Sequence, residues 1–219
     1  QKVFTKQELF EVAWGEPYSV EDSTVNVHVS NLRRKLKSRE RLDIEAVPLG
    51  DARFGSLDVL EELYGLYLGV YGQSEIHFDL LTRDFFAGLL QSREIGGVVF
   101  CYRHDGELVG YNICLEHGGM LIDKYIGLRY PQARELDLYF VSWFVNLEHA
   151  LGRGLRFYVA GWTDPEVKAS LGARFTFTRH LVWVRNPILR RILYMFRHWF
   201  ESDAKAVGAK AADKDTDHA

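Results

Sequence analysis

The sequence predicts an α+β (α/β) domain in which helices flank a mixed, mostly antiparallel sheet, with a shorter helical segment before it. Three observations support this prediction. Apolar residues recur at helical spacing over 57–71, apolar and polar residues alternate on both sides of a turn at 105–106, and 136–151 reads as one long, largely apolar helix. The length of 219 residues suits one full domain and a partial one.

Composition and charge exclude several classes of protein. A hydrophobic share of 47% is enough for a substantial core, and a net charge of -3 gives no overall attraction to nucleic acid, so any basic surface must be local. No apolar run reaches the roughly 18 to 20 residues that span a bilayer, and the first twenty residues lack the features of a secretory signal. Two cysteines and scattered histidines predict no metal site. We therefore expect a cytoplasmic protein without a bound metal.

Two helices are expected in the first 42 residues. Thr5 and Glu8 form a capping box, which starts a helix to about residue 14. Asp22 or Ser23 can cap the second helix. Apolar residues at steps of four and three predict one buried stripe on that helix, made of Val25, Val29, Leu32 and Leu36.

The opposite side of this second helix is basic. Residues 23–41 hold six Arg or Lys and one acid, a local charge of +5 in an otherwise acidic chain. A basic helix is more often only a solvated surface, and that alternative stays open beside contact with phosphates. The polar and basic residues concerned are Thr24, His28, Asn31, Arg33, Arg34, Lys35 and Lys37.

The larger domain opens with two helices. Apolar residues at helical spacing predict the first, which Gly72 is expected to end: Leu57, Leu60, Tyr64, Tyr67 and Tyr71. The second is expected from Thr82, a plausible cap, to Ser92. Its apolar side would consist of Phe85, Phe86, Leu89 and Leu90.

A β-hairpin follows these helices. Asp105 and Gly106 are typical of a two-residue turn, and the segments on both sides alternate. A two-residue turn places Cys101 opposite Gly110. The second cysteine, Cys114, then does not face the first, so we expect no disulfide.

The remaining elements follow from the same signals. A strand is expected over 120–126, and the helix over 136–151 is apolar on most sides. Its single polar stripe predicts one solvent-facing edge, made of Ser142, Asn146, His149 and Arg153. The later elements are a buried strand ending at Gly161, a short helix over 164–171, an alternating strand over 173–184, an amphipathic helix over 187–200 and a disordered tail over 203–219.

The order of these elements resembles the GNAT acyltransferase fold, and more closely its FemAB-like branch, over about residues 43–202. The segments "DGELVG" at the hairpin and "RGLRFYVAGWTDPEVKASLGARF" after the long helix add to the resemblance. It implies transfer of an acyl group from acetyl-CoA or another acyl-CoA to a small-molecule or peptide amine, with aminoacyl-tRNA as the other donor. It also implies that neighbouring strands part between 123–126 and 157–161 to admit the donor, with its phosphates at the first turn of the long helix.

Candidate site residues follow from this resemblance. Asp123 and Tyr125 alternate with apolar neighbours on the strand beside the gap, and they are the first choices for the base and acid that an amine acceptor requires. The alternative is a polar strand face open to solvent. The chain has "RYPQARELD" where the family has a glycine-rich phosphate loop. The expected cofactor-binding residues are Arg129, Arg134, Gly161, Trp162, Asp164 and Lys168, although Asp164 also reads as a helix cap and Lys168 as a solvated side chain.

A second resemblance covers the N-terminal segment. "VFTKQELFEVAWGEPYSVEDSTVNVHVSNLRRKLK" is similar to the DNA-binding domain of OmpR/PhoB-type response regulators, and "IEAVPLGDARFG" sits where that family has its wing hairpin. The resemblance divides the chain into a partial winged-helix segment (1–42), the GNAT-like domain (43–202) and the tail. It implies contact with duplex DNA over 23–54, through Thr24, His28, Asn31, Arg33, Arg34 and Arg53.

Two alternatives concern function and partners. The competing function is a DNA-binding transcriptional regulator whose GNAT-like half senses a small molecule without turnover. The amphipathic, basic segment 187–200 can lie on an anionic membrane surface. It can also pack against the sheet or a second subunit.

Overall fold

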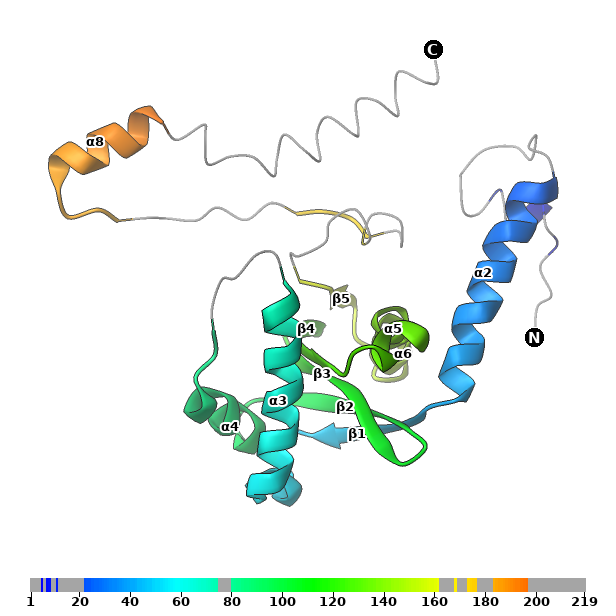
Figure 1. Ribbon diagram of the computed structural model, residues 1–219. Helices are drawn as coiled ribbons and strands as arrows, with labels where there is room; N and C mark the ends of the chain where they lie inside the picture. The colour runs from blue at the N-terminus through cyan, green and yellow to red at the C-terminus, as the bar shows by residue number, and fades with distance from the viewer. Residues whose placement is uncertain are drawn as a thin grey trace, which may run out of the picture. The chain divides into compact units, whose positions relative to one another are not determined.

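The computed structural model describes residues 5, 7, 8, 11, 22–74, 80–161, 168, 173–176 and 183–196, with the backbone alone for 22–29. The chain divides into two compact units, residues 1–161 and 162–219. The first unit holds a five-stranded sheet in the order β1-β2-β3-β4-β5, flanked by helices (Figure 1). The predicted mixed, mostly antiparallel α/β class is confirmed.

The first unit contains, in chain order, α2 (Asp22–Glu40), β1 (Asp43–Pro48), the 3-10 helix η1 (Ala52–Gly55), α3 (Leu57–Gln73), α4 (Arg83–Gln91), β2 (Gly97–His104), β3 (Glu107–His117), β4 (Met120–Leu128), α5 (Gln132–Glu135), α6 (Leu138–Gly152) and β5 (Phe157–Val159). The second unit contains α8 (Pro187–Met195). Strands β1 to β4 pair antiparallel, and β5 pairs parallel to β4. In the described ranges, no helix combines the length and apolarity needed to cross a bilayer.

Strand β1 belongs to the central sheet. It pairs with β2 from Asp43 opposite Arg103 to Pro48 opposite Val98. The predicted wing hairpin in this segment is therefore wrong. The physical reason is that β1 gains a ladder partner in β2, fifty or more residues away, and buries Val47 in the core beneath the helices.

The β2–β3 hairpin turns at the predicted residues but has a different register. Asp105 and Gly106 both adopt positive φ, as a two-residue turn of this kind requires. A bulge between Tyr102 and Arg103 then shifts the ladder, so that Cys101 lies opposite Tyr111 and the predicted partner Gly110 is wrong. Both cysteines are free, and they belong to hydrophobic clusters on different faces of the sheet.

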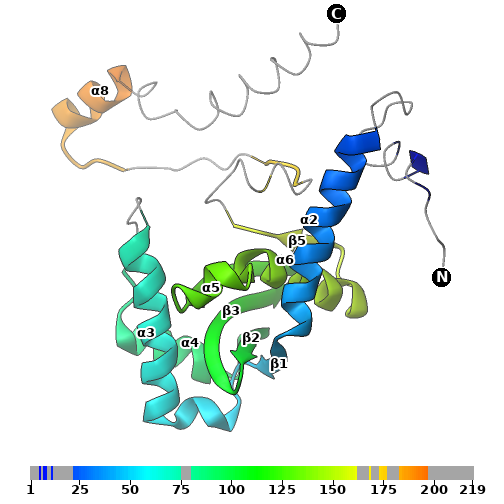
Figure 2. The same ribbon diagram turned by 45° about the vertical axis from the view of Figure 1, so that its right-hand side comes forward.

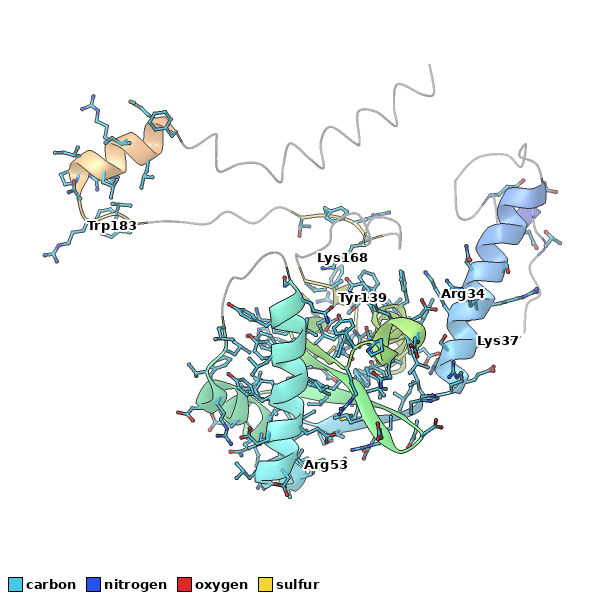
Figure 3. All side chains as sticks on the ribbon, in the orientation of Figure 1. Arg34, Lys37, Arg53, Tyr139, Lys168 and Trp183 are labelled. Carbon is cyan, nitrogen blue, oxygen red and sulfur yellow. The ribbon has the colours of Figure 1, made fainter. Side chains whose placement is uncertain are left out.

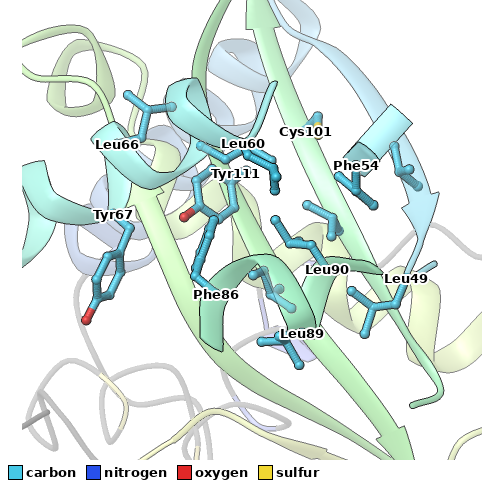
Figure 4. Close-up of a cluster of buried hydrophobic side chains, with 14 of the residues drawn as sticks. Leu49, Phe54, Leu60, Leu66, Tyr67, Phe86, Leu89, Leu90, Cys101 and Tyr111 are labelled. Carbon is cyan, nitrogen blue, oxygen red and sulfur yellow. The ribbon is translucent and has the colours of Figure 1, made fainter. Parts of the chain in front are cut away.

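Helices α3 and α4 cover one face of the sheet. The buried residues of this layer include Leu66 of α3, Phe86 and Leu90 of α4, and Phe54 of η1 (Figure 4). The predicted cap of α4 is confirmed, because the Thr82 hydroxyl accepts a hydrogen bond from the backbone N–H of Phe85 at 3.2 Å. Two predicted details are wrong. Helix α3 does not end at Gly72 but continues to Gln73. Phe85, which was expected on the buried side of α4, is 54% exposed, because the next residue, Phe86, faces the sheet.

Helix α6 covers the other face, and the first two residues of its polar stripe point inward. Ser142 and Asn146 are 1% and 0% exposed, so the predicted solvent-facing edge is wrong for these two, whereas the Arg153 side chain is 62% exposed as predicted. Ser142 and Asn146 lie on the face covered by the sheet, which offers hydrogen-bonding partners: Asn112 of β3 donates to the Asn146 carboxamide at 3.0 Å. The polar stripe therefore begins as a buried contact and reaches solvent at the end of the helix.

Helix α2 contacts α6 through one side, and two residues of its apolar stripe are exposed. Leu32 and Leu36 are 45% and 39% exposed, so the predicted buried stripe is wrong for these two, while the side chains of Val25 and Val29 lie outside the described residues. Figure 2 shows α2 running beside α6. The contact uses the other side of the helix, where Ser38 is buried. Earlier in the chain, the predicted capping box is present: Glu8 N–H donates to the Thr5 hydroxyl at 3.1 Å.

The later elements are confirmed only in part. Asn186 caps α8 by accepting from the backbone N–H of Ile188, and the helix ends at Met195, not near residue 200. Strand β5 is shorter than predicted and more open, since Phe157 is 59% exposed at the border of the described sheet. Residues 173–176 and 183–184 are not in a strand, and the rest of that predicted strand, most of the helix over 164–171 and the tail over 203–219 lie outside the described residues.

Candidate active site

Strands β4 and β5 pair over three residues, the full length of β5. The ladder runs from Met120 opposite Phe157 to Ile122 opposite Val159, whereas β4 continues to Leu128. Among the described strands, none pairs with this further edge of β4. The described pairing thus ends at Ile122, just before the segment 123–126 where the sequence places the donor gap, and Phe157 to Val159 are themselves paired.

A bulge in β4 separates the two predicted catalytic residues. Tyr125 pairs with Ile113 and Asp123 pairs with Cys114, so Lys124 between them has no opposite partner in the ladder. The extra residue reverses the alternation, and Tyr125 packs against the cluster under α3 and α4 whereas Asp123 faces α6. The expectation that Asp123 and Tyr125 share one strand face is therefore wrong.

Asp123 is held by a network of polar side chains. Its Oδ2 accepts hydrogen bonds from Asn146 Nδ2 at 3.1 Å and from the Tyr158 hydroxyl at 3.0 Å, and its Oδ1 accepts from Asn112 Nδ2 at 3.4 Å. The Tyr102 hydroxyl in turn donates to Asn112 Oδ1 at 2.6 Å. The network joins β2, β3, β4, β5 and α6, so the sheet and the helix fix the position of this carboxylate together.

Burial and charge set the ionisation of the neighbouring groups. Burial, followed by the nearby charge of Asp123, raises the pKa of the Tyr158 hydroxyl far above its ordinary value. The same two causes, in the same order, raise the pKa of the Cys114 thiol. Tyr158 therefore stays protonated at neutral pH and acts as a hydrogen-bond donor to the carboxylate.

Sequence reasoning missed most members of this network. Asn112 is a single amide in the apolar run "LVGYNICL", and such a residue signals a buried hydrogen bond. Asn146 lay in a recognised polar stripe that was assigned to solvent. No sequence signal identifies Tyr158, because tyrosine is common in strands.

A second polar cluster lies near the end of α6. His149 Nε2 lies 2.8 Å from Glu116 Oε1, and Arg153 Nη2 donates to Glu116 Oε2 at 3.1 Å. The hydrogen bond from His149, and then that from Arg153, lowers the pKa of the Glu116 carboxyl, although burial opposes this. The cluster lies at the edge of the α6–sheet contact, since the Arg153 side chain is 62% exposed.

A pocket of about 310 Å³ lies where β4 ends and α6 begins. Asp137 caps the start of α6 with φ 50, and it lines the pocket. Figure 3 shows Tyr139 in the first turn of α6 and Arg34 on α2. The complete lining is Leu128, Tyr130, Ala133, Arg134, Asp137, Tyr139 and Phe140.

Of the two arginines predicted for phosphate binding, one reaches this pocket. Arg134 is in its lining, 5.1 Å from the centre of the Tyr130 ring. Arg129 points elsewhere: its Nε donates to the carbonyl of Leu108 at 3.0 Å, and its guanidinium lies 3.6 Å from Glu62. The reason is that Arg129 follows the last strand residue directly and faces the α3 layer.

The other predicted cofactor residues lie beyond the paired part of β5. Gly161 has φ 72, a conformation suited to glycine, and it is exposed. Trp162 and Asp164 lie outside the described residues. Lys168 is helical and 4% exposed, so the alternative of a solvated lysine is wrong. It belongs to the second unit.

The residues expected to face DNA are divided between solvent and protein contacts. Asn31 and Arg33 are exposed, and the side chains of Thr24 and His28 lie outside the described residues. Arg34 lies 3.6 Å from Asp137. Arg53 lies in η1, where its guanidinium donates to Glu45 at 2.8 Å and to Asp51 at 3.1 Å.

Two further basic residues of α2 contact α6. Lys35 Nζ lies 3.2 Å from the centre of the Phe140 ring, and Arg39 makes two hydrogen bonds to the Glu148 carboxylate at 2.6 and 2.5 Å. Several basic side chains of α2 thus contact α6 and the residue before it. Within the described ranges, no group of three or more His, Cys, Asp or Glu side chains is arranged to hold a metal ion.

Comparison with known families gives two matches that share part of the chain. A model described as "Acetyltransferase (GNAT) domain" matches residues 28–169, and one described as "Transcriptional regulatory protein, C terminal" matches residues 1–49. The response regulator GtcR of Aneurinibacillus migulanus is 40% identical over 62 residues, which is 27% of this chain and 26% of that protein. The chain therefore spans about a quarter of the length of this curated relative.

Solved structures with a similar chain path include several acetyltransferases. An aminoglycoside acetyltransferase from an uncultured soil metagenomic sample has 15% identity and a TM-score of 0.44 over 65% of this chain and 98% of its own. A ribosomal-protein-alanine N-acetyltransferase from Brucella melitensis biovar Abortus 2308 has 20% identity and a TM-score of 0.43, over 65% and 99%. An aminoglycoside N-acetyltransferase in complex with CoA has 14% identity and a TM-score of 0.39, over 67% and 95%.

Proposed function

Since the chain belongs to the GNAT acetyltransferase family, we propose that it transfers an acyl group from an acyl-CoA to an amine. Aminoacyl-tRNA, which FemAB-like enzymes use, is the alternative donor. The observation that carries the proposal is the match of residues 28–169 to the GNAT acetyltransferase domain, and the hydrogen-bonded Asp123 carboxylate and the pocket at the end of β4 support it. The carboxylate offers a group that can accept the proton of an amine.

The pocket at the far end of β4 supports a long donor. Leu128 lies five positions after Asp123, which corresponds to roughly 16 Å along a strand. A ligand that places charged groups in the pocket and its reactive carbonyl near Asp123 must therefore carry a long arm between them. Acyl-CoA has this form, with a thioester at one end and phosphates at the other.

Asp123 is the proposed base. The neutral amine attacks the carbonyl carbon, the new C–N bond forms, and Asp123 takes the proton that the nitrogen releases. The C–S bond then breaks, and the thiolate leaves and takes a proton from water. Tyr125 is not part of this proposed site, since it packs on the opposite face of the sheet.

Thermal denaturation with acetyl-CoA is the first test, because a ligand that binds only the folded state raises the melting temperature. The proposal also expects release of free CoA thiol when a panel of amines and peptides with free amino termini is added. A matched run with aminoacyl-tRNA separates the two donors. Absence of both stabilisation and product with either donor would contradict the proposed function.

A DNA-binding regulator with a GNAT-like sensor is the second candidate. The match of residues 1–49 to a transcriptional regulator model favours it, as do the exposed Arg33 and Lys37 on α2. Binding to duplex DNA should then weaken steeply as salt is added, because phosphate contacts release counterions. Absence of binding at low salt would remove this candidate.

A further inference from the structure

The pocket at the start of α6 differs from a simple phosphate site. Its loop has no glycines between Arg129 and Asp137, so the backbone is less free to approach an anion closely. The carboxylate of Asp137 also stands at the start of α6, where the helix dipole would otherwise favour a phosphate. A donor with phosphates therefore needs positive charge from elsewhere.

Helix α2 brings that charge to the pocket. The Arg34 guanidinium lies 3.6 Å from Asp137 Oδ2, and Lys35 Nζ lies 3.2 Å from the centre of the Phe140 ring. Asp137 and Phe140 both line the pocket. Burial lowers the pKa of Lys35, and the charge of Asp137 opposes this, as expected for an ammonium group beside that carboxylate.

The charges around the pocket favour an anion. Arg34 and Lys35 at the border and Arg134 in the lining carry three positive charges, against one negative charge on Asp137. The Arg34 side chain is 65% exposed, so it can leave Asp137 and turn to a ligand without loss of packing. Arginine binds phosphate oxygens with two parallel hydrogen bonds, and lysine binds them as a point charge.

We propose that Arg34 and Lys35 of α2 bind the phosphate groups of the acyl donor, so that the helix shared by both family matches forms part of the acyltransferase donor site. This inference rests on the proposed function. The phosphates belong either to CoA or to the acceptor end of a tRNA, and the chemistry of recognition is the same for both. The side chains of α2 thus supply the phosphate contacts that the glycine-free loop before α6 is poorly suited to make with its backbone.

The test compares two double variants of the full chain by equilibrium binding. Arg34→Ala with Lys35→Ala removes the proposed contacts, and Arg33→Ala with Lys37→Ala is the control, because it removes the same charge from exposed positions of the same helix. Each protein is titrated with CoA and, separately, with tRNA at several salt concentrations. The first variant should bind the donor about tenfold more weakly and with a smaller salt dependence, whereas the control should bind CoA nearly as the original protein does.

The ligand whose binding is weakened in the first variant identifies the source of the phosphates. A loss confined to CoA assigns the site to acyl-CoA, and a loss confined to tRNA assigns it to aminoacyl-tRNA. Equal weakening in both double variants would overturn the inference, because it would reflect overall charge. Unchanged binding in the first variant would overturn it as well.

Failure of the inference can be distinguished from failure of the proposed function. S-acetyl-N-acetylcysteamine is a thioester without phosphates, so its turnover should be the same in the original protein and in both double variants. Turnover of this compound together with unchanged CoA and tRNA binding in the first variant would leave the proposed function intact and overturn the inference. Absence of donor binding and of turnover in the original protein would overturn both.

Asp137→Asn separates ligand binding from a structural role of Arg34. Asparagine also tolerates the positive φ at this position, so the backbone is retained. If Arg34 binds phosphate, removing the carboxylate frees it and lowers repulsion, so the variant should bind the donor several-fold more tightly. Weaker binding would show that the ion pair only holds α2 in place and would contradict the inference.

Discussion

Asn146 on α6 donates a hydrogen bond from Nδ2 to Oδ2 of Asp123 on β4, at 3.1 Å. This contact joins the helix and the sheet one residue after the last described pairing of β4 with β5, at Ile122. Asn146 is fully buried, so it cannot exchange this partner for water. The carboxylate is thereby fixed beside the edge of β4 that the proposed donor would occupy.

Asp123→Asn should lower turnover strongly while donor binding is retained. The amide keeps the size of the side chain but cannot take a proton, and loss of a general base costs roughly 100- to 10,000-fold in rate. The measurement is the rate of CoA thiol release together with the dissociation constant for CoA. Asp105→Asn is the control, since Asp105 lies in the exposed hairpin turn. Full turnover in Asp123→Asn would show that the residue serves only structure.

Gly127→Ala should destabilise the protein. A methyl group at this position would overlap the ring of Tyr111 and would lie 3.0 Å from Leu66 Cβ, both of which are buried in the core. Such overpacking typically costs about 1 to 3 kcal/mol. Gly88→Ala is the opposite control, because nothing lies within 4 Å of its added methyl group in α4, and it should stabilise the helix by about 0.5 to 1 kcal/mol. Urea denaturation curves measure both, and equal curves for the two variants would contradict this packing.

The Glu116 cluster should make stability depend on pH. The folded-state pKa of Glu116 lies below its unfolded value, so its contribution is fully present above about pH 4.3 and is lost as the pH falls through the lowered pKa. Glu116→Gln should therefore melt at a lower temperature than the original protein at neutral pH. The difference in melting temperature should disappear in acid. Glu107→Gln, at an exposed hairpin position, should melt as the original protein does. A difference in melting temperature that stays constant down to pH 3 would rule out a stabilising role of the ionised Glu116 carboxylate.

Both cysteines should be unreactive in the folded protein. Burial raises the pKa of the Cys101 thiol to about 11, so only about one molecule in a thousand carries the thiolate at pH 8. Burial raises the pKa of Cys114 still further. Reaction with a chromogenic disulfide should be slow in buffer and should reach two thiols per chain in urea, since the chain contains two cysteines and both are free. Rapid reaction of the native protein would mean that one thiol is accessible.

Local signals in the sequence predicted most individual elements correctly. The Thr82 cap of α4, the turn at Asp105 and Gly106, and the Asn186 cap of α8 are all present in the structure. Each depends on hydrogen bonds or backbone angles within a few residues, so neighbouring side chains contain the needed information. For the same reason, the order of the longer helices and strands from α3 to β5 could be predicted, whereas the four-residue helix α5 was not expected.

Arrangements that depend on distant partners were not predictable in the same way. The bulge at Lys124 turns Tyr125 away from Asp123, and it exists because β3 and β4 must match over their whole ladder. Likewise, the inward direction of Asn146 follows from the amide and carboxylate that the sheet presents to it. The sequence pattern of an amphipathic helix defines two faces but does not determine which of them a sheet will cover.

The same division holds for the N-terminal helix. Its amino acids establish that α2 is helical and basic, since spacing and charge are properties of the segment itself. Only the packing of α2 against α6 determines which groups these basic side chains contact. Arg34 faces Asp137 and Arg39 binds Glu148, residues more than a hundred positions away. Contacts between segments so far apart arise only when the whole unit folds, because each side chain then meets the partner that lowers its energy most.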